Sequence, residues 1–282
     1  MTALASRRFL LSALSLIGLI VAVSVAIYYA SDAYVYDAHA YWLSDGYSRA
    51  SQDTDAFSYS PPVLLAFQAI RAVLPWEAFA YVYTIAIALG IWVLAGPFTL
   101  LVLFIPHVAT EMSLGNIHIF LALVTVFGLR WPWLWSFVLL TKVTPGVGLV
   151  WFAVRREWRA LLIALGVTAA IALPTVVLFP DLWAGWIRVV TDAGPGAGSN
   201  LVARVVLGAA VVAIGGWKNW PWLVPVGSML ALPVLWSLHG FSMLVAVLWY
   251  VRKLPVFEGD RSTVLPREPA ATEPAVALNP RA

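Results

Sequence analysis

A polar segment after the first long apolar run holds the residues best suited to chemistry at an aqueous surface. Asp37 lies early in this segment and is followed by His39, Tyr41 and Trp42. A carboxylate held at a membrane surface can act as a general base on an alcohol, because partial burial raises its pKa. Asp37 is therefore a candidate catalytic base, and a solvated loop aspartate is the alternative interpretation.

Four ionisable residues lie within or beside other apolar runs: Arg71, Glu111, His118 and Lys142. A charge in hydrocarbon is costly, so such a residue is a functional candidate until a partner explains it. Arg71 lies near the predicted inner end of its helix, where a long side chain reaches the interface and marks topology. Glu111 and His118 flank a break at residues 114–116, which fits a simple loop as well as a site.

Lys142 lies near the middle of the apolar run 132–154, with Pro145 three residues beyond it. Proline has no N–H to donate, so it leaves a carbonyl of the preceding turn free. Two interpretations stay open. Lys142 is either a functional residue or a buried lysine paired with that carbonyl or with Glu111.

The composition excludes an ordinary soluble domain, because 62% of the 282 residues are hydrophobic and 11% are charged, against about 45–50% and 25% in soluble proteins. Only helices and closed barrels span lipid, and barrel strands alternate polar with apolar residues. The apolar runs here are continuous. They predict an all-α, polytopic transmembrane bundle of about 8–10 helices.

The net charge of +3 does not indicate nucleic acid as a partner, because the basic residues form short clusters between apolar runs. These clusters read as topology signals. The chain contains no cysteine, which excludes disulfides, thiolate catalysis and thiolate metal sites. The sequence also lacks a compact His/Asp cluster that would favour a metal.

The first apolar run predicts an uncleaved signal anchor. Arg7 and Arg8 precede the uncharged residues 9–30, a run longer than the apolar core of a signal peptide. The positive-inside rule places these arginines, and so the N-terminus, in the cytoplasm. The polar residues 31–60 then form a loop on the outer face.

Counting crossings from the anchor predicts the rest of the topology. Five runs follow the outer loop, and we count each as a crossing: 61–74, 77–95, 98–109, 117–128 and 132–154. This count delivers the basic cluster 155–159 to the cytoplasm, as the positive-inside rule requires.

The remaining runs predict further crossings on either side of a second outer loop. Residues 161–179 lead to that loop at 180–200, residues 201–216 return, and 222–251 form two helices that turn near His239. Residues 1–254 then make one transmembrane domain with both termini cytoplasmic. Residues 255–282, rich in Pro, Ala and Glu, are predicted to be a disordered cytoplasmic tail.

An ordered set of motifs runs from Asp37 to Gly240. Each motif is weak alone. The first three are Asp37 four residues before Tyr41, then Phe57-Ser58-Tyr59-Ser60-Pro61-Pro62, then Gly115-Asn116-Ile117-His118. The next three are Lys142-Val143-Thr144-Pro145 followed by the basic cluster, then Ser199-Asn200 with Arg204, then Ser237-Leu238-His239. In this order they resemble glycosyltransferase family 87, polytopic C-type enzymes that transfer mannose or a related sugar from a polyprenyl phosphate. The family's Gly-Gln-x-Asn pattern is altered here at both polar positions.

The resemblance implies roles for particular residues. Asp37 would be the general base, and His239, placed by the topology on the same outer face, would donate to the leaving phosphate. Tyr41, Lys142, Asn200 and Arg204 would bind substrate or phosphate, although the crossing count puts Lys142 deep in the membrane. No metal or other cofactor is implied.

The resemblance also implies partners and a location. The donor would be a polyprenyl-phosphate sugar and the acceptor a cell-envelope glycolipid or polysaccharide, within a multi-pass protein of the plasma membrane. Two other classes remain open: a non-catalytic or degenerate membrane subunit, and a secondary transporter. A transporter is expected to show paired halves, and no internal repeat is apparent.

Overall fold

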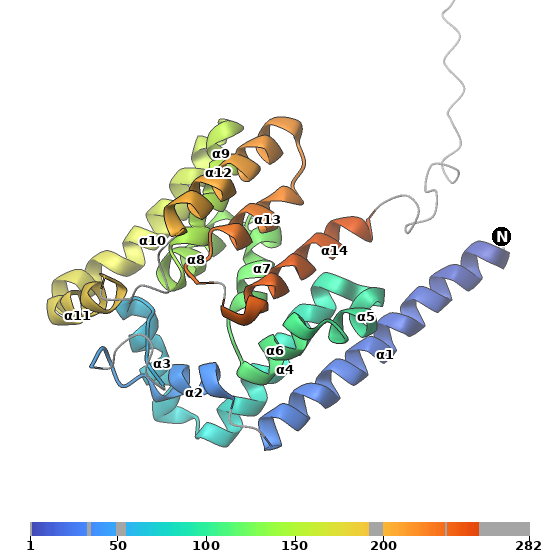
Figure 1. The fold of residues 1–282 in the computed structure, drawn as a ribbon, viewed down its shortest axis with the longest axis horizontal. Helices are drawn as coiled ribbons and strands as arrows, with labels where there is room; N and C mark the ends of the chain where they lie inside the picture. The colour runs from blue at the N-terminus through green and yellow to red at the C-terminus, as the bar shows by residue number, and fades with distance from the viewer. Residues whose placement is uncertain (1, 33–34, 49–54, 192–199, 235, 254–282) are drawn as a thin grey trace, which may run out of the picture.

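The computed structural model describes residues 2–32, 35–48, 55–191, 200–234 and 236–253. These described residues form α-helices, 3-10 helices and connecting turns, without a strand (Figure 1). The predicted all-α fold is confirmed. The predicted tail, 255–282, lies outside the described residues.

Four stretches in the described part of the chain are long and apolar enough to cross a membrane: Phe9–Ser31, Trp76–Leu103, Trp158–Leu178 and Leu201–Lys218. A fifth arises if α6 (Pro106–Leu114) and α7 (His118–Phe127), bent by 110°, count as one span. The other helices are shorter. The described part of the bundle therefore combines four candidate spans with one bent pair and several shorter helices.

The outward faces of the long helices are apolar. On α10 (Trp158–Leu178), Leu162 is 68% exposed and Val177 is 78% exposed. On α1 (Thr2–Asp32), Phe9 is 77% exposed. Exposed apolar surface on this scale is expected where side chains contact lipid rather than water.

Helix α4 (Trp76–Ala95) packs along α1 and ends at Gly96. Gly96 has a φ of +56°. Residues other than glycine adopt this conformation only at a cost in free energy. The short helices η1 (Gly96–Phe98) and α5 (Thr99–Leu103) follow, and Pro106 begins α6. The run 98–109, predicted as one crossing, is thus divided between helices.

A hairpin of short helices replaces the single crossing predicted for 132–154. After η2 (Pro132–Leu134), α8 (Trp135–Thr141) ends at Lys142, and η3 (Thr144–Leu149) and α9 (Val150–Val154) lead away. Gly146 faces Leu139, and Gly148 faces Trp135, so the two arms run antiparallel. The prediction that Lys142 lies mid-helix is wrong, because Lys142 follows the last residue of α8 at the tip of the hairpin. Its depth in the membrane stays a prediction.

The run 61–74 was also expected to cross, but α3 (Pro61–Val73) lies beside α2 (Tyr36–Leu43) at the lower end in Figure 1. Trp42 donates to the carbonyl of Leu74 at 2.9 Å, and Gln68 donates to that of Ser44 at 3.0 Å. Thirteen residues reach only about 20 Å, less than the roughly 30 Å of a bilayer core.

The C-terminal elements close the bundle around the hairpin. Helix α11 (Pro180–Thr191) occupies most of the predicted second outer loop, and its Trp186 donates to the carbonyl of Ser58 at 3.2 Å. Helices α12 (Leu201–Lys218) and α13 (Leu223–Leu230) cross at Gly208 and Gly227. The last helices, η4 (Trp236–Leu244) and α14 (Val245–Val251), pack on α6 and α7.

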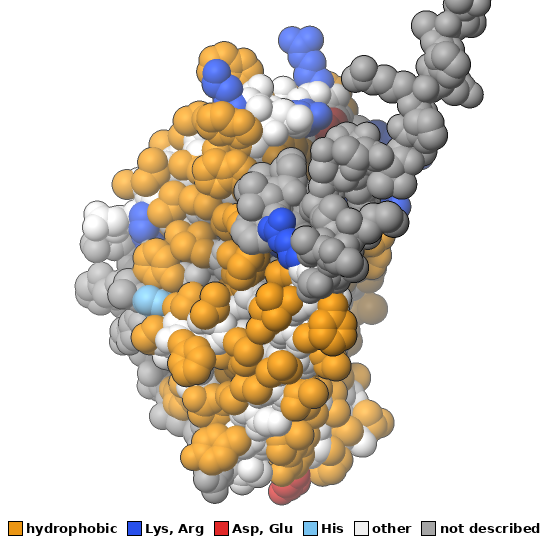
Figure 2. Space-filling model, turned by 90° about the vertical axis from the view of Figure 1, so that its right-hand side faces the viewer, with side chains coloured by type: hydrophobic (Ala, Val, Ile, Leu, Met, Phe, Trp, Pro, Cys, Tyr) orange, Lys and Arg blue, Asp and Glu red, His pale blue; other side chains and the backbone are white. Residues whose placement is uncertain are grey.

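Basic side chains gather toward one end of the molecule. Arg155 donates to Asn219 at 2.8 Å, which joins the basic cluster after α9 to the end of α12. Figure 2 shows Lys and Arg side chains in the upper half of the face it presents. The helix that carries Asp37, α2, lies at the opposite, lower end in Figure 1.

Candidate active site

Asp37 lies in the first turn of α2, and α2 packs against the break between α6 and α7. Gly115 forms this break with a φ of +66°. A Cβ built on Gly115 would lie 2.5 Å from Val35 and 2.7 Å from Ala38. Glycine therefore serves both the left-handed turn and the close approach of α2.

Replacing Gly115 with alanine is expected to lower the free energy of unfolding by about 2–5 kcal/mol, since it adds left-handed strain and overpacking. Thermal unfolding in detergent would measure this loss. Gly166→Ala is the matched control, because within the described residues a Cβ at that position in α10 meets no atom within 4 Å beyond its own stretch of helix backbone. Equal stability of the two variants would contradict the role given to Gly115.

Asn116 connects Asp37 to the interior of the bundle. Its Nδ2 donates to Asp37 Oδ2 at 2.6 Å, and its Oδ1 accepts from the backbone N–H of Ile117 at 2.7 Å. Lys142 Nζ also approaches Oδ1, at 3.4 Å. Two donors at Oδ1 fix the amide so that its N–H group faces the carboxylate.

Lys142 continues the network into a buried pair. Its Nζ lies 2.8 Å from His118 Nε2, and His118 Nδ1 lies 2.9 Å from Glu111 Oε2. Glu111 is 0% exposed and His118 is 1% exposed. Groups buried to this degree require hydrogen-bonded partners, and these contacts make Asp37, Asn116, Lys142, His118 and Glu111 one polar network.

The direction of each hydrogen bond follows from the donors available. A lysine ammonium only donates, so His118 Nε2 accepts from Lys142 and the neutral ring carries its proton on Nδ1. That proton is donated to Glu111, whose Oε1 also accepts from the N–H of Ile119 at 3.3 Å. Lys142 uses two of its three N–H groups in this arrangement, leaving one for a substrate.

The surroundings of Asp37 suit a base. Burial raises the pKa of Asp37 from 3.8 to about 6, while the Asn116 hydrogen bond and the Lys142 charge lower it in part. A pKa in this range leaves the carboxylate ionised at neutral pH and more basic than an exposed aspartate. The side chain is half-buried, so one of its faces is open to solvent or substrate.

The segment before α3 ties the Lys142 hairpin to the Asp37 loop. Both the N–H and the hydroxyl of Ser60 donate to the carbonyl of Leu140, at 3.2 and 2.6 Å. The Tyr41 hydroxyl lies 2.7 Å from that of Tyr59, and the Tyr41 ring packs on Phe67. Tyr41 is buried in this aromatic cluster, and a substrate-binding role for it stays a prediction.

The other predicted site residues lie toward the C-terminal half. Arg204 Nη2 donates to the carbonyl of Pro233 at 2.8 Å, and its Nη1 is buried without a hydrogen-bond partner among the described residues. Asn200 precedes α12 and is exposed. His239 belongs to η4, but its side chain lies outside what the structure describes. Their assigned roles stay predictions.

Sequence reasoning did not select Asn116 as a site residue, although it connects the carboxylate to the lysine. The signal was its place in the altered Gly-Asn-Ile-His motif, beside a glycine that ends a helix. Glu111 and His118 were left open between a loop and a site. In the structure they lie in α6 and α7, on either side of the break, and both belong to the polar network. A functional role for them stays a prediction.

Fold and site together define a class: a helical membrane protein with a buried polar network that leads to a carboxylate at one end of the bundle. The family model of glycosyltransferase family 87 matches residues 56–264. The chain belongs to this family and is a membrane glycosyltransferase. Neither a curated protein nor a solved structure matches it.

The matched segment contains Glu111, Asn116, His118 and Lys142, and begins after Asp37. Membership in the family implies a lipid-linked donor and an acceptor. It leaves the sugar, the acceptor and the catalytic base to be argued from the site.

Proposed function

We propose that the protein transfers mannose, or a related hexose or pentose, from a polyprenyl-phosphate sugar to a cell-envelope glycolipid or polysaccharide, with Asp37 as general base. The observation that supports this best is the contact of Asn116 with both Asp37 and Lys142. A base and a cation separated by one amide suit a reaction that deprotonates an alcohol and releases a phosphate.

In the proposed reaction, Asp37 takes the proton of the acceptor hydroxyl while the oxygen of that hydroxyl attacks the anomeric carbon. The bond from that carbon to the phosphate oxygen breaks, and polyprenyl phosphate leaves with the bonding electrons. Lys142 offsets the charge that develops on the phosphate. Direct displacement inverts the configuration at the anomeric carbon.

The remaining predicted residues take supporting roles in this proposal. His239 donates to the leaving phosphate, and Arg204, Asn200 and Tyr41 contribute to substrate binding. Among the described residues, the Nη1 of Arg204 has no hydrogen-bond partner, which supports a role for that residue with an anionic ligand. No metal is required by these steps.

The proposed location is the plasma membrane, with Asp37 on the outer face and both termini in the cytoplasm. The gathering of Arg155, Lys218 and Arg252 away from α2 supports this orientation, because basic residues favour the cytoplasmic side.

A non-catalytic or degenerate subunit is the second candidate. The observation in its favour is the altered motif at Asn116 and His118, where the family usually carries Gln and Asn. The hydrogen bonds of Asn116 and His118 argue against a site that has lost its function, since each residue is bonded to another polar member of the network.

The test is sugar transfer from polyprenyl-phosphate mannose in membranes that contain the wild-type protein, against membranes that lack it. Donors with other polyprenyl-linked hexoses and pentoses are assayed in parallel. Transfer with inversion that depends on the protein would support the proposal. Absence of transfer from every donor, with well-folded protein, would favour the non-catalytic subunit.

The transfer rate is expected to fall about tenfold per pH unit below pH 6 and to level off above it. The reason is that Asp37 acts as a base only when ionised, and its pKa is raised to about 6. Initial rates between pH 4.5 and 8 would measure this, with each sample returned to pH 7 to exclude unfolding. A rate that stays flat down to pH 4.5 would contradict a base with this pKa.

A further inference from the structure

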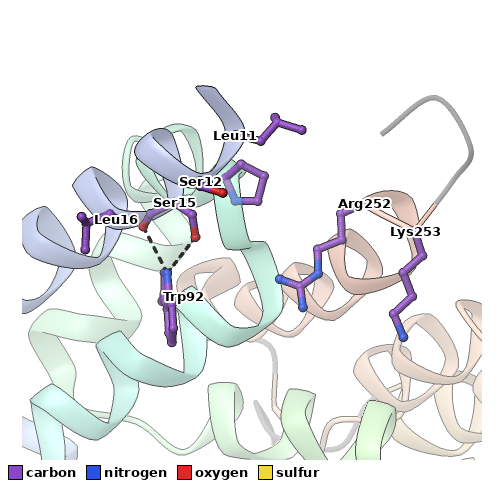
Figure 3. Close-up of a pocket in the computed structure, with 8 residues that line it drawn as sticks. Leu11, Ser12, Ser15, Leu16, Trp92, Arg252 and Lys253 are labelled. Carbon is purple, nitrogen blue, oxygen red and sulfur yellow. Dashed lines mark hydrogen bonds between the residues drawn. The ribbon is translucent and has the colours of Figure 1, made fainter. Parts of the chain in front are cut away.

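A cavity of about 520 Å³ lies beside Arg252 and Lys253, away from the Asp37 network (Figure 3). It is formed by α1, the turn after α4, and the residues that follow α14. Its size falls within the range of ligand sites, roughly 300–1,000 Å³. Nothing in the glycosyl transfer described above uses this cavity.

Two consecutive basic residues, Arg252 and Lys253, line one side of the cavity (Figure 3). Arg252 and Lys253 each lie 4.2 Å from the ring centroid of Trp249. The guanidinium of Arg252 also packs against Gly96, where a Cβ would lie 2.6 Å from Nη1. Both cations therefore pack against the same tryptophan ring.

Within the described ranges, no acidic residue lines the cavity and neither Arg252 nor Lys253 forms an ion pair. Positive charges on neighbouring residues repel each other, and a bound anion lowers that cost. The cavity is therefore electrostatically suited to a negatively charged group.

The opposite wall supplies hydroxyl groups. Ser12 and Ser15 are one helical turn apart on α1 and face the cavity. Trp92 Nε1 donates to the Ser15 carbonyl at 3.1 Å and to its Oγ at 3.0 Å. Because Ser15 Oγ accepts that bond, its own O–H stays available to donate to an anion.

Apolar surface continues from the cavity along α1. Leu16, which lines the cavity, is 57% exposed, and Ile20 one turn further is also 57% exposed. A soluble anion gains nothing from this surface, whereas an acyl chain does. Basic pockets between transmembrane helices are the usual sites for anionic lipid headgroups.

We propose that this cavity binds an anionic membrane phospholipid, with its phosphodiester between Arg252, Lys253 and the serines of α1 and its acyl chains along α1. The site is separate from the proposed transfer reaction and does not depend on it.

The experiment compares lipid binding by the full-length wild-type protein and the double variant Arg252→Gln/Lys253→Gln, using native mass spectrometry. The probes are phosphatidylglycerol, phosphatidylcholine with the same acyl chains, and glycerol phosphate without chains. The wild type is expected to prefer phosphatidylglycerol, and the double variant to bind it roughly 30-fold more weakly, as expected for two cations near an anionic surface.

The matched control is Lys218→Gln/Arg159→Gln, which removes two exposed cations outside the cavity. This control is expected to bind phosphatidylglycerol as the wild type does. An equal loss in the control would overturn the proposal in favour of a diffuse surface charge. Equal binding of phosphatidylcholine, or equally tight binding of glycerol phosphate, would also overturn it.

The alternative occupant of this cavity is an acidic side chain of the C-terminal sequence, which would compete with the lipid phosphate for Arg252 and Lys253. Binding of phosphatidylglycerol that appears only after Glu258→Gln and Asp260→Asn would identify these acidic residues as the occupant and overturn the proposal. Unfolding temperatures of all variants in lipid-free detergent show that each is folded before binding is compared.

Discussion

Replacing Asp37 with asparagine is expected to slow sugar transfer about 10²–10⁴-fold, the usual contribution of a general base. Asparagine has nearly the same shape, and its carbonyl oxygen can still accept from Asn116, as Asp37 Oδ2 does at 2.6 Å. The network is therefore expected to survive while the proton acceptor is lost. Initial rates with saturating donor would measure the effect.

Asp181→Asn is the matched control for this variant, because Asp181 is an exposed aspartate in the first turn of α11. It is expected to transfer sugar at the wild-type rate. Full activity of Asp37→Asn would exclude this carboxylate as the base. An unfolding temperature well below that of the wild type would indicate structural damage, and Asp37→Glu would then be required to restore measurable activity.

The second large effect is expected for Lys142→Gln, with kcat/KM for the donor reduced about 10²–10³-fold. This magnitude is typical for loss of one group that stabilises developing negative charge. The KM for the acceptor is expected to change little. Lys218→Gln, which removes an exposed lysine beside Trp217, is the control and is expected to leave both constants unchanged.

A purely structural role for Lys142 would leave the pH profile unchanged, so residual activity of Lys142→Gln supplies a second measurement. The Lys142 charge lowers the pKa of Asp37. Its removal is expected to shift the acidic limb of the rate profile above pH 6. A limb that stays at the wild-type position would contradict electrostatic contact between the two residues.

The helical class of the fold could be predicted because a continuous apolar run can span lipid only as an α-helix. The positions of the breaks were harder to predict. Hydropathy does not distinguish one crossing from a hairpin of two short helices, and at 132–154 the hairpin is stabilised by Gly146 and Gly148 facing the opposite arm.

Some of the counted crossings differ in the structure. The run 61–74 forms α3 beside α2, and 132–154 forms a hairpin. The basic cluster 155–159 follows α9, which lies at the end of the molecule opposite α2 (Figure 1). A charge pattern therefore does not establish that each counted helix crosses.

The candidate site was predictable one residue at a time but not as a network. Asp37 and Lys142 were recognised from residue type and motif, yet 105 positions of sequence separate them. The contact between them depends on Asn116 and on the left-handed turn at Gly115. A turn with a glycine beside an asparagine is common in loops, so sequence alone gives it no special weight.

The amide of Asn116 also keeps the Asp37 carboxylate and the Lys142 ammonium from forming a direct ion pair. A direct ion pair between Asp37 and Lys142 would hold the carboxylate ionised at low pH and make it a weak proton acceptor, and it would occupy the ammonium as well. The interposed amide keeps the opposite charges close without letting them neutralise each other. An aspartate at position 116 would remove that separation by competing for the lysine and by repelling the carboxylate it now supports.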